Sequence, residues 1–356
     1  MITRKFCLYK QCPSRVVITM SFAERLAQKR QGLQETTTRV TNRAGEVFIE
    51  EKGGSGLRVV GKTDNPEYFQ LTTTTSYSPA VFHANKWNKR ENLNLPSQPP
   101  CALSTLTFVT YNVWFSEECK IERAQALAQL LVKQSADIIC LQEVTAEFLT
   151  VILSCTYFQE QYYCSDASGY SSITPYGVVM FCKRELEITD FTLHQMPSNM
   201  GRRALSVVVT INKRKLVLTT AHLESLDNAE LRSAQLNDTI YPLLLDSDAH
   251  YSIFMGDSNF CTFSEEFEEN IAEKPLKDVW LALHPNSDVK NSTTMLYSKP
   301  MVIDRVLISA ETIKPKEIIR IGTAPVFHSG PHKGEPATDS FHPQNDIKDA
   351  ILPSDH

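Results

Sequence analysis

The chain has 356 residues, of which 42% are hydrophobic and 22% are charged, and its net charge is −5. This length is sufficient for a substantial core and has room for one large domain plus an extension. No apolar run is long enough to span a membrane as a helix, so no membrane partner is expected.

The nine cysteines are an odd number and lack the spacing of zinc ligands. Cys140, Cys155 and Cys182 lie in apolar surroundings, which is typical of small core residues. A reducing intracellular location, nuclear or cytoplasmic, is therefore expected. The start of the chain holds basic residues and no acid until Glu24, which resembles a mitochondrial targeting segment, so that location is the less favoured alternative.

Residues 1–100 are predicted to form a basic, weakly structured extension that ends in the linker-like segment 95–100. They carry fifteen Lys and Arg against eight Asp and Glu. This charge suits contact with nucleic acid, although scattered positive charge is more commonly solvated surface. One hairpin is predicted here, with strands at 47–49 and 57–60.

Residues 101–356 are predicted to form the main domain, in which strands and helices alternate. Strands are predicted at 106–111, 136–141, 176–182, 204–211, 216–222, 251–255 and 301–308. Apolar residues recur at a helical period over 121–133, and a second helix is predicted at 230–245. Residues 322–350 have the composition of a long loop. This order predicts a mixed α/β sandwich.

Four of the apolar runs end in polar side chains that can bind a metal or a phosphate. Two end at Asn112 and Glu143, and the other two end at His222 and in the pair Asp257 and Asn259. Polar groups at the ends of successive buried strands can converge on one cleft. The sequence therefore predicts a site at these strand ends.

Each of these residues also has a structural interpretation. Mg²⁺ usually takes one or two carboxylates, which suits Glu143, but a carboxylate here could simply cap the helix that follows. Asp257 and Asn259 project to the same side if the strand continues. The sequence Gly-Asp-Ser-Asn is also typical of a turn, in which Asp257 would have only a structural role. His222 is able to bind a phosphate oxygen or to be a satisfied core histidine.

Other charged and aromatic residues are candidates for positioning or substrate binding. Asp304 lies in an apolar strand, where it could orient His356 or pair with Arg305. Arg202 and Arg203 begin a strand and could clamp a phosphate, and Tyr176 could donate to the same group. The alternative for these three residues is an ordinary surface or core role.

Taken in order, these motifs resemble the endonuclease/exonuclease/phosphatase superfamily of metal-dependent phosphoesterases. The motifs are Tyr111-Asn112, Leu141-Gln142-Glu143-Val144, Tyr176-Gly177, His222-Leu223-Glu224-Ser225, Gly256-Asp257-Ser258-Asn259, Ile303-Asp304-Arg305 and Ser354-Asp355-His356. The resemblance extends from about residue 106 to the end. It implies an α/β fold, a four-layer αββα sandwich, with a Mg²⁺ site, or Mn²⁺ in its place, at one end.

The resemblance also implies roles for the site residues. Glu143, assisted by Asn112, would hold the metal, and Asp355 would hold the metal or its waters. Asp257 would position or activate the attacking water, and Asn259 and His222 would bind phosphoryl oxygens. His356, oriented by Asp304, would stabilise developing charge or accept a proton. Tyr176, Arg202 and Arg203 would bind substrate.

Within the superfamily the chain is most similar to 5′-tyrosyl-DNA phosphodiesterases, through residues 220–225, 277–280 and 353–356. This implies hydrolysis of the phosphodiester between a tyrosine and a DNA 5′ end, in DNA repair. Two alternatives remain, namely another superfamily substrate (RNA poly(A), an inositol or a sphingolipid phosphoester) or a weakly catalytic nucleic-acid-binding module. The final strand that the superfamily has after Ser-Asp-His is expected to be lacking.

Overall fold

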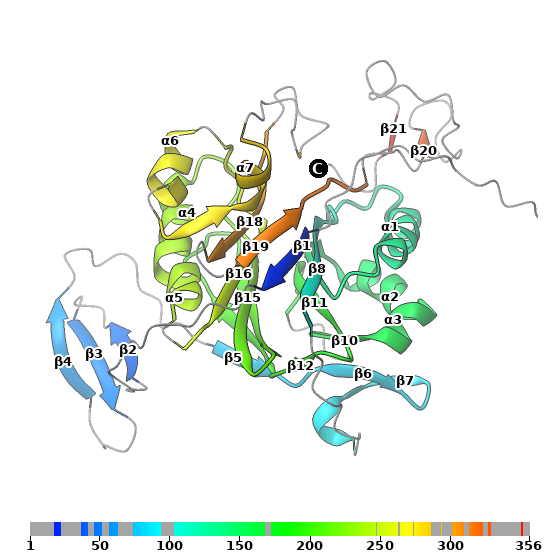
Figure 1. Ribbon diagram of the computed structural model, residues 1–356, viewed down its shortest axis with the longest axis horizontal. Coiled ribbons are helices and arrows are strands. Elements are labelled where there is room, and N and C mark those ends of the chain that lie inside the picture. The colour runs from blue at the N-terminus through cyan, green and yellow to red at the C-terminus, as the bar shows by residue number, and fades with distance from the viewer. Residues whose placement is uncertain are drawn as a thin grey trace, which may run out of the picture.

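Figure 1 shows the fold in a computed structural model of the chain. The structure describes the backbone and side chains of residues 74–93, 103–167, 172–246, 248–262, 264–272, 274–285, 293, 301–309 and 313–322. It describes the backbone alone of residues 18–22, 37–41, 46–51, 57–62, 327–328 and 350–351.

The first large sheet has a parallel pair of strands at its centre. β8 (Thr105–Asn112) and β9 (Ile138–Val144) run parallel because α1 (Lys120–Gln134) carries the chain back between them. All other neighbours are antiparallel. The order of its eight strands is β19 (Ile313–Glu317), β1 (Ile18–Phe22), β8, β9, β11 (Gly177–Lys183), β10 (Tyr162–Cys164), β6 (Ala80–His83) and β7 (Lys86–Lys89).

The second large sheet repeats this plan. β15 (Arg214–His222) and β16 (Tyr251–Asp257) run parallel, joined by α4 (Ala229–Gln235), a π-helical turn (Leu236–Ile240) and α5 (Tyr241–Leu244). The order is β17 (Leu276–Asp278), β18 (Asp304–Ser309), β16, β15, β14 (Arg203–Ile211), β13 (Phe191–Gln195) and β5 (Thr74–Tyr77), and β12 (Glu187–Ile188) pairs with β14.

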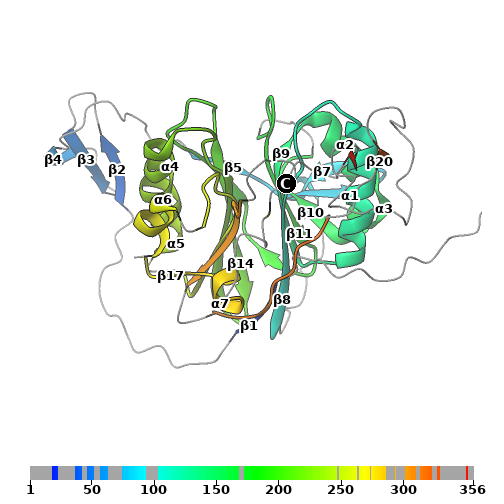
Figure 2. The ribbon, with the colours of Figure 1, turned by 90° about the horizontal axis from the view of Figure 1, so that it is seen from above.

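The two sheets face each other and helices cover both outer faces, as Figure 2 shows. Side chains of the central strands alternate between two cores, so Phe108 and Cys140 contact the other sheet while Val109 and Ile139 contact helices. Burial on both faces explains the continuous apolar runs in the sequence. The predicted four-layer αββα sandwich is confirmed.

The remaining helices and short strands either cover a sheet or connect its strands along the chain. α2 (Ala146–Ser154) and α3 (Thr156–Gln161) lie with α1 on the first sheet. The others are η1 (Arg90–Asn92), α6 (Glu265–Phe267), η3 (Glu268–Ala272) and α7 (Val279–Leu283). Within the predicted loop 322–350, the described residues form β20 (Phe327–His328), which pairs with β21 (Ala350–Ile351). None of the described helices is both long and apolar enough to cross a membrane.

Parts of residues 1–100 belong to the two large sheets, which corrects the expectation of a weakly structured extension. β1 pairs with β8 and β19, β5 pairs with β13, and β6 pairs with β10. β5 is an edge strand of mostly exposed Thr and Ser, so no apolar period marks it in the sequence. The predicted hairpin is confirmed within a separate sheet of β2 (Thr37–Thr41), β3 (Glu46–Glu51) and β4 (Leu57–Lys62).

Truncation tests this pairing. Deleting residues 1–95 removes β1, β5, β6 and β7 from the sheets, so we expect a much lower melting temperature and loss of a single cooperative transition. Deleting only residues 1–69 keeps β5, β6 and β7, and its effect should be smaller. Circular dichroism melts of both forms and the full chain make the comparison, and three equal melting temperatures would show that these strands add no stability.

Candidate active site

The polar ends of the two parallel strand pairs meet between the sheets. Asn112 ends β8 beside Gln142 of β9, and His222 ends β15 beside Asp257 of β16. The Asn112 Nδ2 donates to Asp257 Oδ2 over 3.0 Å, which joins the first sheet to the second. Because parallel strands present their carboxyl ends at one edge, the predicted convergence of the strand ends is what the structure shows.

Two further features keep these strand ends in register. Gln142 is wholly buried and its Nε2 donates to Thr220 Oγ1 across the sheets over 3.1 Å. Gly256 lies so close to Ala221 that an added Cβ would be 2.1 Å from the Ala221 carbonyl oxygen. Only glycine permits this approach, which places the following Asp257 level with His222.

Asp257 is 0% exposed, and both of its carboxylate oxygens have polar partners. Its Oδ2 accepts from Asn112 and lies 3.3 Å from His222 Nε2. Its Oδ1 accepts from the backbone N–H of Asn259 over 2.8 Å, which is an Asx turn. The turn interpretation of Asp257 is therefore correct, and its other carboxylate oxygen faces Asn112 and His222.

Glu143 does not cap the following helix. Thr145 is the N-cap of α2, and its hydroxyl accepts from the Phe148 N–H. Glu143 has a φ of +60°, a strained value for this residue type, and its Oε2 accepts from the Phe115 N–H over 3.0 Å. The Oε1 lies 3.5 Å from His222 Nδ1, so the carboxylate is turned toward the cluster.

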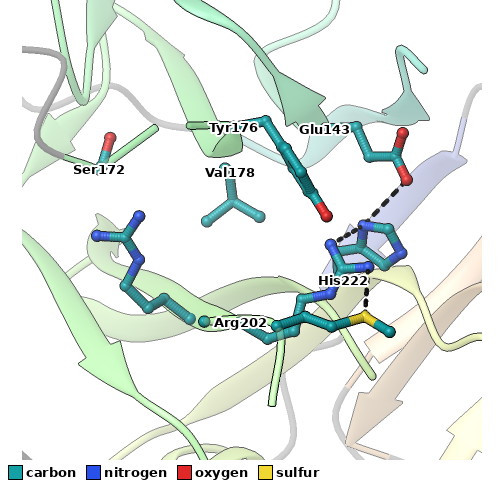
Figure 3. A pocket seen from close by; sticks show the side chains of 10 residues that line it. Glu143, Ser172, Tyr176, Val178, Arg202 and His222 are labelled. Carbon is teal, nitrogen blue, oxygen red and sulfur yellow. Dashed lines mark hydrogen bonds and ion pairs between the residues drawn. The ribbon is translucent and has the colours of Figure 1, made fainter. Parts of the chain in front are cut away.

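Figure 3 shows His222 beside Glu143 and Arg202. The His222 Nε2 also lies near Asp257. Arg202 Nη1 is 2.9 Å from His222 Nδ1, and a guanidinium has no acceptor. The Nδ1 must therefore accept this bond, which leaves the proton on Nε2, where it points to Asp257 Oδ2 at 3.3 Å. The ring is therefore held from both sides.

Arg202 is the one of the two predicted arginines that reaches the cluster. It is 7% exposed, its Nη2 donates to Ser225 Oγ over 2.7 Å, and its Cζ lies 5.4 Å from the centre of the Tyr176 ring. Its Nε is buried and has no hydrogen-bond partner among the described residues. The guanidinium lines the pocket, where its positive charge favours an anion.

The remaining predicted residues lie at the edge of the cluster or outside the described part of the chain. Arg203 Nη2 contacts the Thr174 carbonyl over 3.4 Å, and Asn259 Nδ2 donates to the Leu223 carbonyl over 2.9 Å. Asn259 has a φ of +56°, so it follows the turn and not an extended strand. Asp304 lies directly across from Asp257 in the β16–β18 ladder, while Asp355 and His356 lie outside the described residues.

Arg305 holds the segment that follows β16, a role that the sequence did not predict. Its wholly buried guanidinium forms an ion pair with Asp278 (3.2 Å) and donates to Ser258 Oγ (2.8 Å), Thr262 Oγ1 (2.7 Å) and the Phe260 carbonyl (2.6 Å). Burial lowers the pKa of Arg305, and the Asp278 carboxylate beside it opposes that shift. The sequence showed Asp304 and Arg305 as adjacent charges in an apolar strand and left open an ion pair between them. The ion pair of Arg305 in the structure is with Asp278.

Glu224 is a second buried group that the sequence did not single out as a site residue. It is 0% exposed, and its carboxylate accepts from Ser198 Oγ (2.6 Å), the Asn199 N–H (2.9 Å) and Gln235 Nε2 (3.2 Å). These bonds tie the loop before β14 to the loop after β15. Arg202 lies at the end of that first loop, so Glu224 fixes its backbone.

A pocket with about 300 Å³ of empty space, partly open to solvent, lies over this cluster. Glu143 and His222 line it from the strand ends, and Tyr176, Arg202 and Arg203 line it from the two sheets. Asp257 lies one contact deeper, behind His222. The pocket therefore offers one carboxylate, an imidazole and two guanidinium groups, which suits a phosphate.

One carboxylate of this pocket is of the kind that a divalent metal ion takes. The described part of the chain holds no group of three or more His, Cys, Asp and Glu side chains able to bind a metal alone. Mg²⁺ usually takes one or two carboxylates and completes its shell with water and substrate phosphate. Glu143, with Oε1 turned to the pocket, supplies such a carboxylate.

The sequence model of the Endonuclease/Exonuclease/phosphatase family matches residues 109–356, which is most of the chain. The chain belongs to this family. As a member of the endonuclease/exonuclease/phosphatase family it is a hydrolase of phosphoesters, and the resemblance stated from the sequence motifs is confirmed.

The family members most similar to this chain include tyrosyl-DNA phosphodiesterase 2 of Danio rerio, with 26% identity over 282 residues that cover 73% of this chain and 71% of the relative. The crystal structure of Danio rerio TDP2 complexed with single strand DNA product has a TM-score of 0.54 and 22% identity, over 70% of this chain and 95% of that chain. A humanized Danio rerio TDP2 with 14 mutations has a TM-score of 0.53 and 20% identity, with the same coverage. These structures share the fold of this chain.

Proposed function

We propose that the chain is a Mg²⁺-dependent phosphodiesterase that hydrolyses the bond between a tyrosine and a DNA 5′ end. The observation that carries this proposal is the pocket in which Glu143, His222 and Arg202 meet, at the ends of strands from both sheets. The relative named tyrosyl-DNA phosphodiesterase 2, and the DNA product bound to the Danio rerio structure, support this substrate.

The proposed substrate is an anion, and the cationic residues of the pocket would bind it. Arg202 has a spare Nε–H, and Arg203 lines the same wall. Tyr176 would donate its hydroxyl to a phosphoryl oxygen, and Asn259 would contact the same group from the opposite edge. Mn²⁺ would serve in place of Mg²⁺ because both ions accept oxygen ligands.

A metal held by Glu143 would polarise the phosphoryl oxygen and neutralise its charge. Asn112 already donates to Asp257 and accepts from the Trp114 N–H over 2.9 Å, so we propose that it orients Asp257 more than it binds metal. A water oxygen then bonds to phosphorus while the bond to the tyrosine oxygen breaks. Asp257 lies behind His222, so it would take the proton of the water through the His222 ring that contacts it.

Three proposed roles concern the C-terminal residues and Asp304. His356 would stabilise the charge that develops on the phosphoryl group, or accept a proton. Asp304, across the ladder from Asp257, would orient its ring. Asp355 would hold the metal or its waters.

We also propose an intracellular location, nuclear or cytoplasmic. The cysteines in the described part of the chain are all free, which suits a reducing compartment. Imaging of the tagged full chain tests this, and secretion into the medium would contradict it.

A substrate panel tests the proposed reaction. The purified chain would be incubated with 5′-phosphotyrosyl single-strand DNA, poly(A) RNA, and inositol and sphingolipid phosphoesters, each with Mg²⁺ and with a chelator. We expect Mg²⁺-dependent release of 5′-phosphorylated DNA to be the fastest reaction. Faster turnover of another substrate would reassign the substrate, and binding of DNA without turnover of any would indicate a binding module.

A further inference from the structure

An aromatic ring beside the pocket is exposed on a backbone that is held in place. Phe115 is 46% exposed, and its N–H donates to Glu143 Oε2 over 3.0 Å. The wholly buried Arg123 of α1 donates to the carbonyls of Val113 (2.7 Å) and Ser116 (2.7 Å), on both sides of Phe115. The backbone around Phe115 is therefore held in place, but the Phe115 ring is not buried in the core.

This ring extends the wall of the pocket outward. Phe115 and Tyr176 are stacked with ring centres 4.7 Å apart and planes 6° apart, and Tyr176 lines the pocket. Stacked rings bury part of each face, and a further planar group can continue such a stack. The exposed part of Phe115 is thus an aromatic surface next to Glu143.

The mouth of the pocket is apolar on other sides as well. Met200 lines the pocket and is 37% exposed. Leu226 is 78% exposed and directly follows Ser225, whose hydroxyl accepts from Arg202. In the part of the chain that the structure describes, five large hydrophobic residues are exposed; of these, Met200 lines the pocket and Phe115 stacks on a ring that lines it. An anion-binding pocket with an apolar group at its mouth suits a ligand that joins a phosphate to a ring.

We propose that Phe115 is a stacking subsite for a planar aromatic ring that the substrate carries next to its phosphate. This deepens the proposed function and rests on it for the phosphoester nature of the ligand. The ring has two possible sources, the nucleobase of the terminal nucleotide or an aryl group on the leaving oxygen. Phe115 thereby sets specificity, while Arg202 and Glu143 serve every phosphoester alike.

Binding of phosphate monoesters tests the subsite without any diester cleavage. Two pairs of ligands separate the sources of the ring. One pair is a 5′-phosphorylated single-strand oligonucleotide with either a base-bearing or an abasic 5′ nucleotide. The other pair is phenyl phosphate and methyl phosphate. Isothermal titration calorimetry gives the ratio of the two dissociation constants for each pair.

We expect the full chain to prefer the ring-bearing member of at least one pair, and Phe115→Ala to reduce that preference about tenfold, the scale of one stacking contact. Phe115→Trp should retain it. Leu245→Ala, at a residue that is 49% exposed on the end of the α5 segment, is the matched control and should change neither ratio.

The pair whose ratio changes identifies the source of the ring. Equal weakening of all four ligands by Phe115→Ala, or no effect on any, would overturn the proposal, because a merely structural role of the Tyr176 stack predicts a uniform effect. A chain that keeps the ring preference but fails to cleave phosphotyrosyl DNA would contradict only the proposed function.

Discussion

Glu143→Gln is expected to reduce Mg²⁺-stimulated hydrolysis by about 1,000-fold, or about 4 kcal/mol of barrier, and to leave the fold intact. The substitution removes the charge that would hold the metal without changing the volume of the side chain. An amide oxygen can still accept the Phe115 N–H, so the loop after β8 keeps its anchor. Turnover of a phosphotyrosyl oligonucleotide and the melting temperature of the same preparation make the measurement.

A matched control for this charge loss lies four residues along the chain. Glu147 is on α2, its side chain is 67% exposed, and Glu147→Gln removes the same charge away from the pocket. We expect its turnover to equal that of the unmodified chain. If Glu143→Gln were active to within a few fold at saturating Mg²⁺, Glu143 would have no part in the site.

Asp257→Asn is expected to reduce turnover by at least about 100-fold, or about 2.7 kcal/mol of barrier, because an amide cannot accept a proton from water. It should also lower stability. The amide oxygen can replace Oδ1 as acceptor for Asn259, but the amide NH₂ then faces donors from Asn112 and His222. Buried donors without acceptors cost about 1–3 kcal/mol each.

The two effects of Asp257→Asn are separable. Activity would be measured well below the melting temperature of the variant, so that loss of folded protein does not enter the rate. Asp248→Asn, at a side chain that is 76% exposed, is the control for the same chemical change and should alter neither quantity. A cost under about tenfold, roughly 1.4 kcal/mol, would mean that Asp257 serves only as a turn residue.

The central strands were predictable from the sequence because burial on both faces gives them continuous apolar runs. β8, β9, β15 and β16 lie where these runs predicted them. Edge strands such as β5 bury little surface and carry no such signal, and their place is set by pairing with strands distant in sequence. For this reason the sequence pattern placed β5 outside the main domain, although it belongs to the second large sheet.

The site was predictable only in part, because strand ends predict convergence but not contacts. Asn112, Glu143, His222 and Asp257 come together as expected. Arg202 reaches His222 from the last residue before β14, and Arg305 pairs with Asp278, which lies 27 residues away. No local pattern in the sequence encodes either contact.

The most direct test of the central claim is metal removal and restoration with one substrate. The full chain would be freed of divalent ions with a chelator, and release of 5′-phosphorylated DNA from a 5′-phosphotyrosyl single strand would be followed before and after Mg²⁺ is added back. The pocket at the strand ends predicts no release without metal and restored turnover with it. Release that the chelator does not affect, or none after Mg²⁺ is restored, would contradict the account.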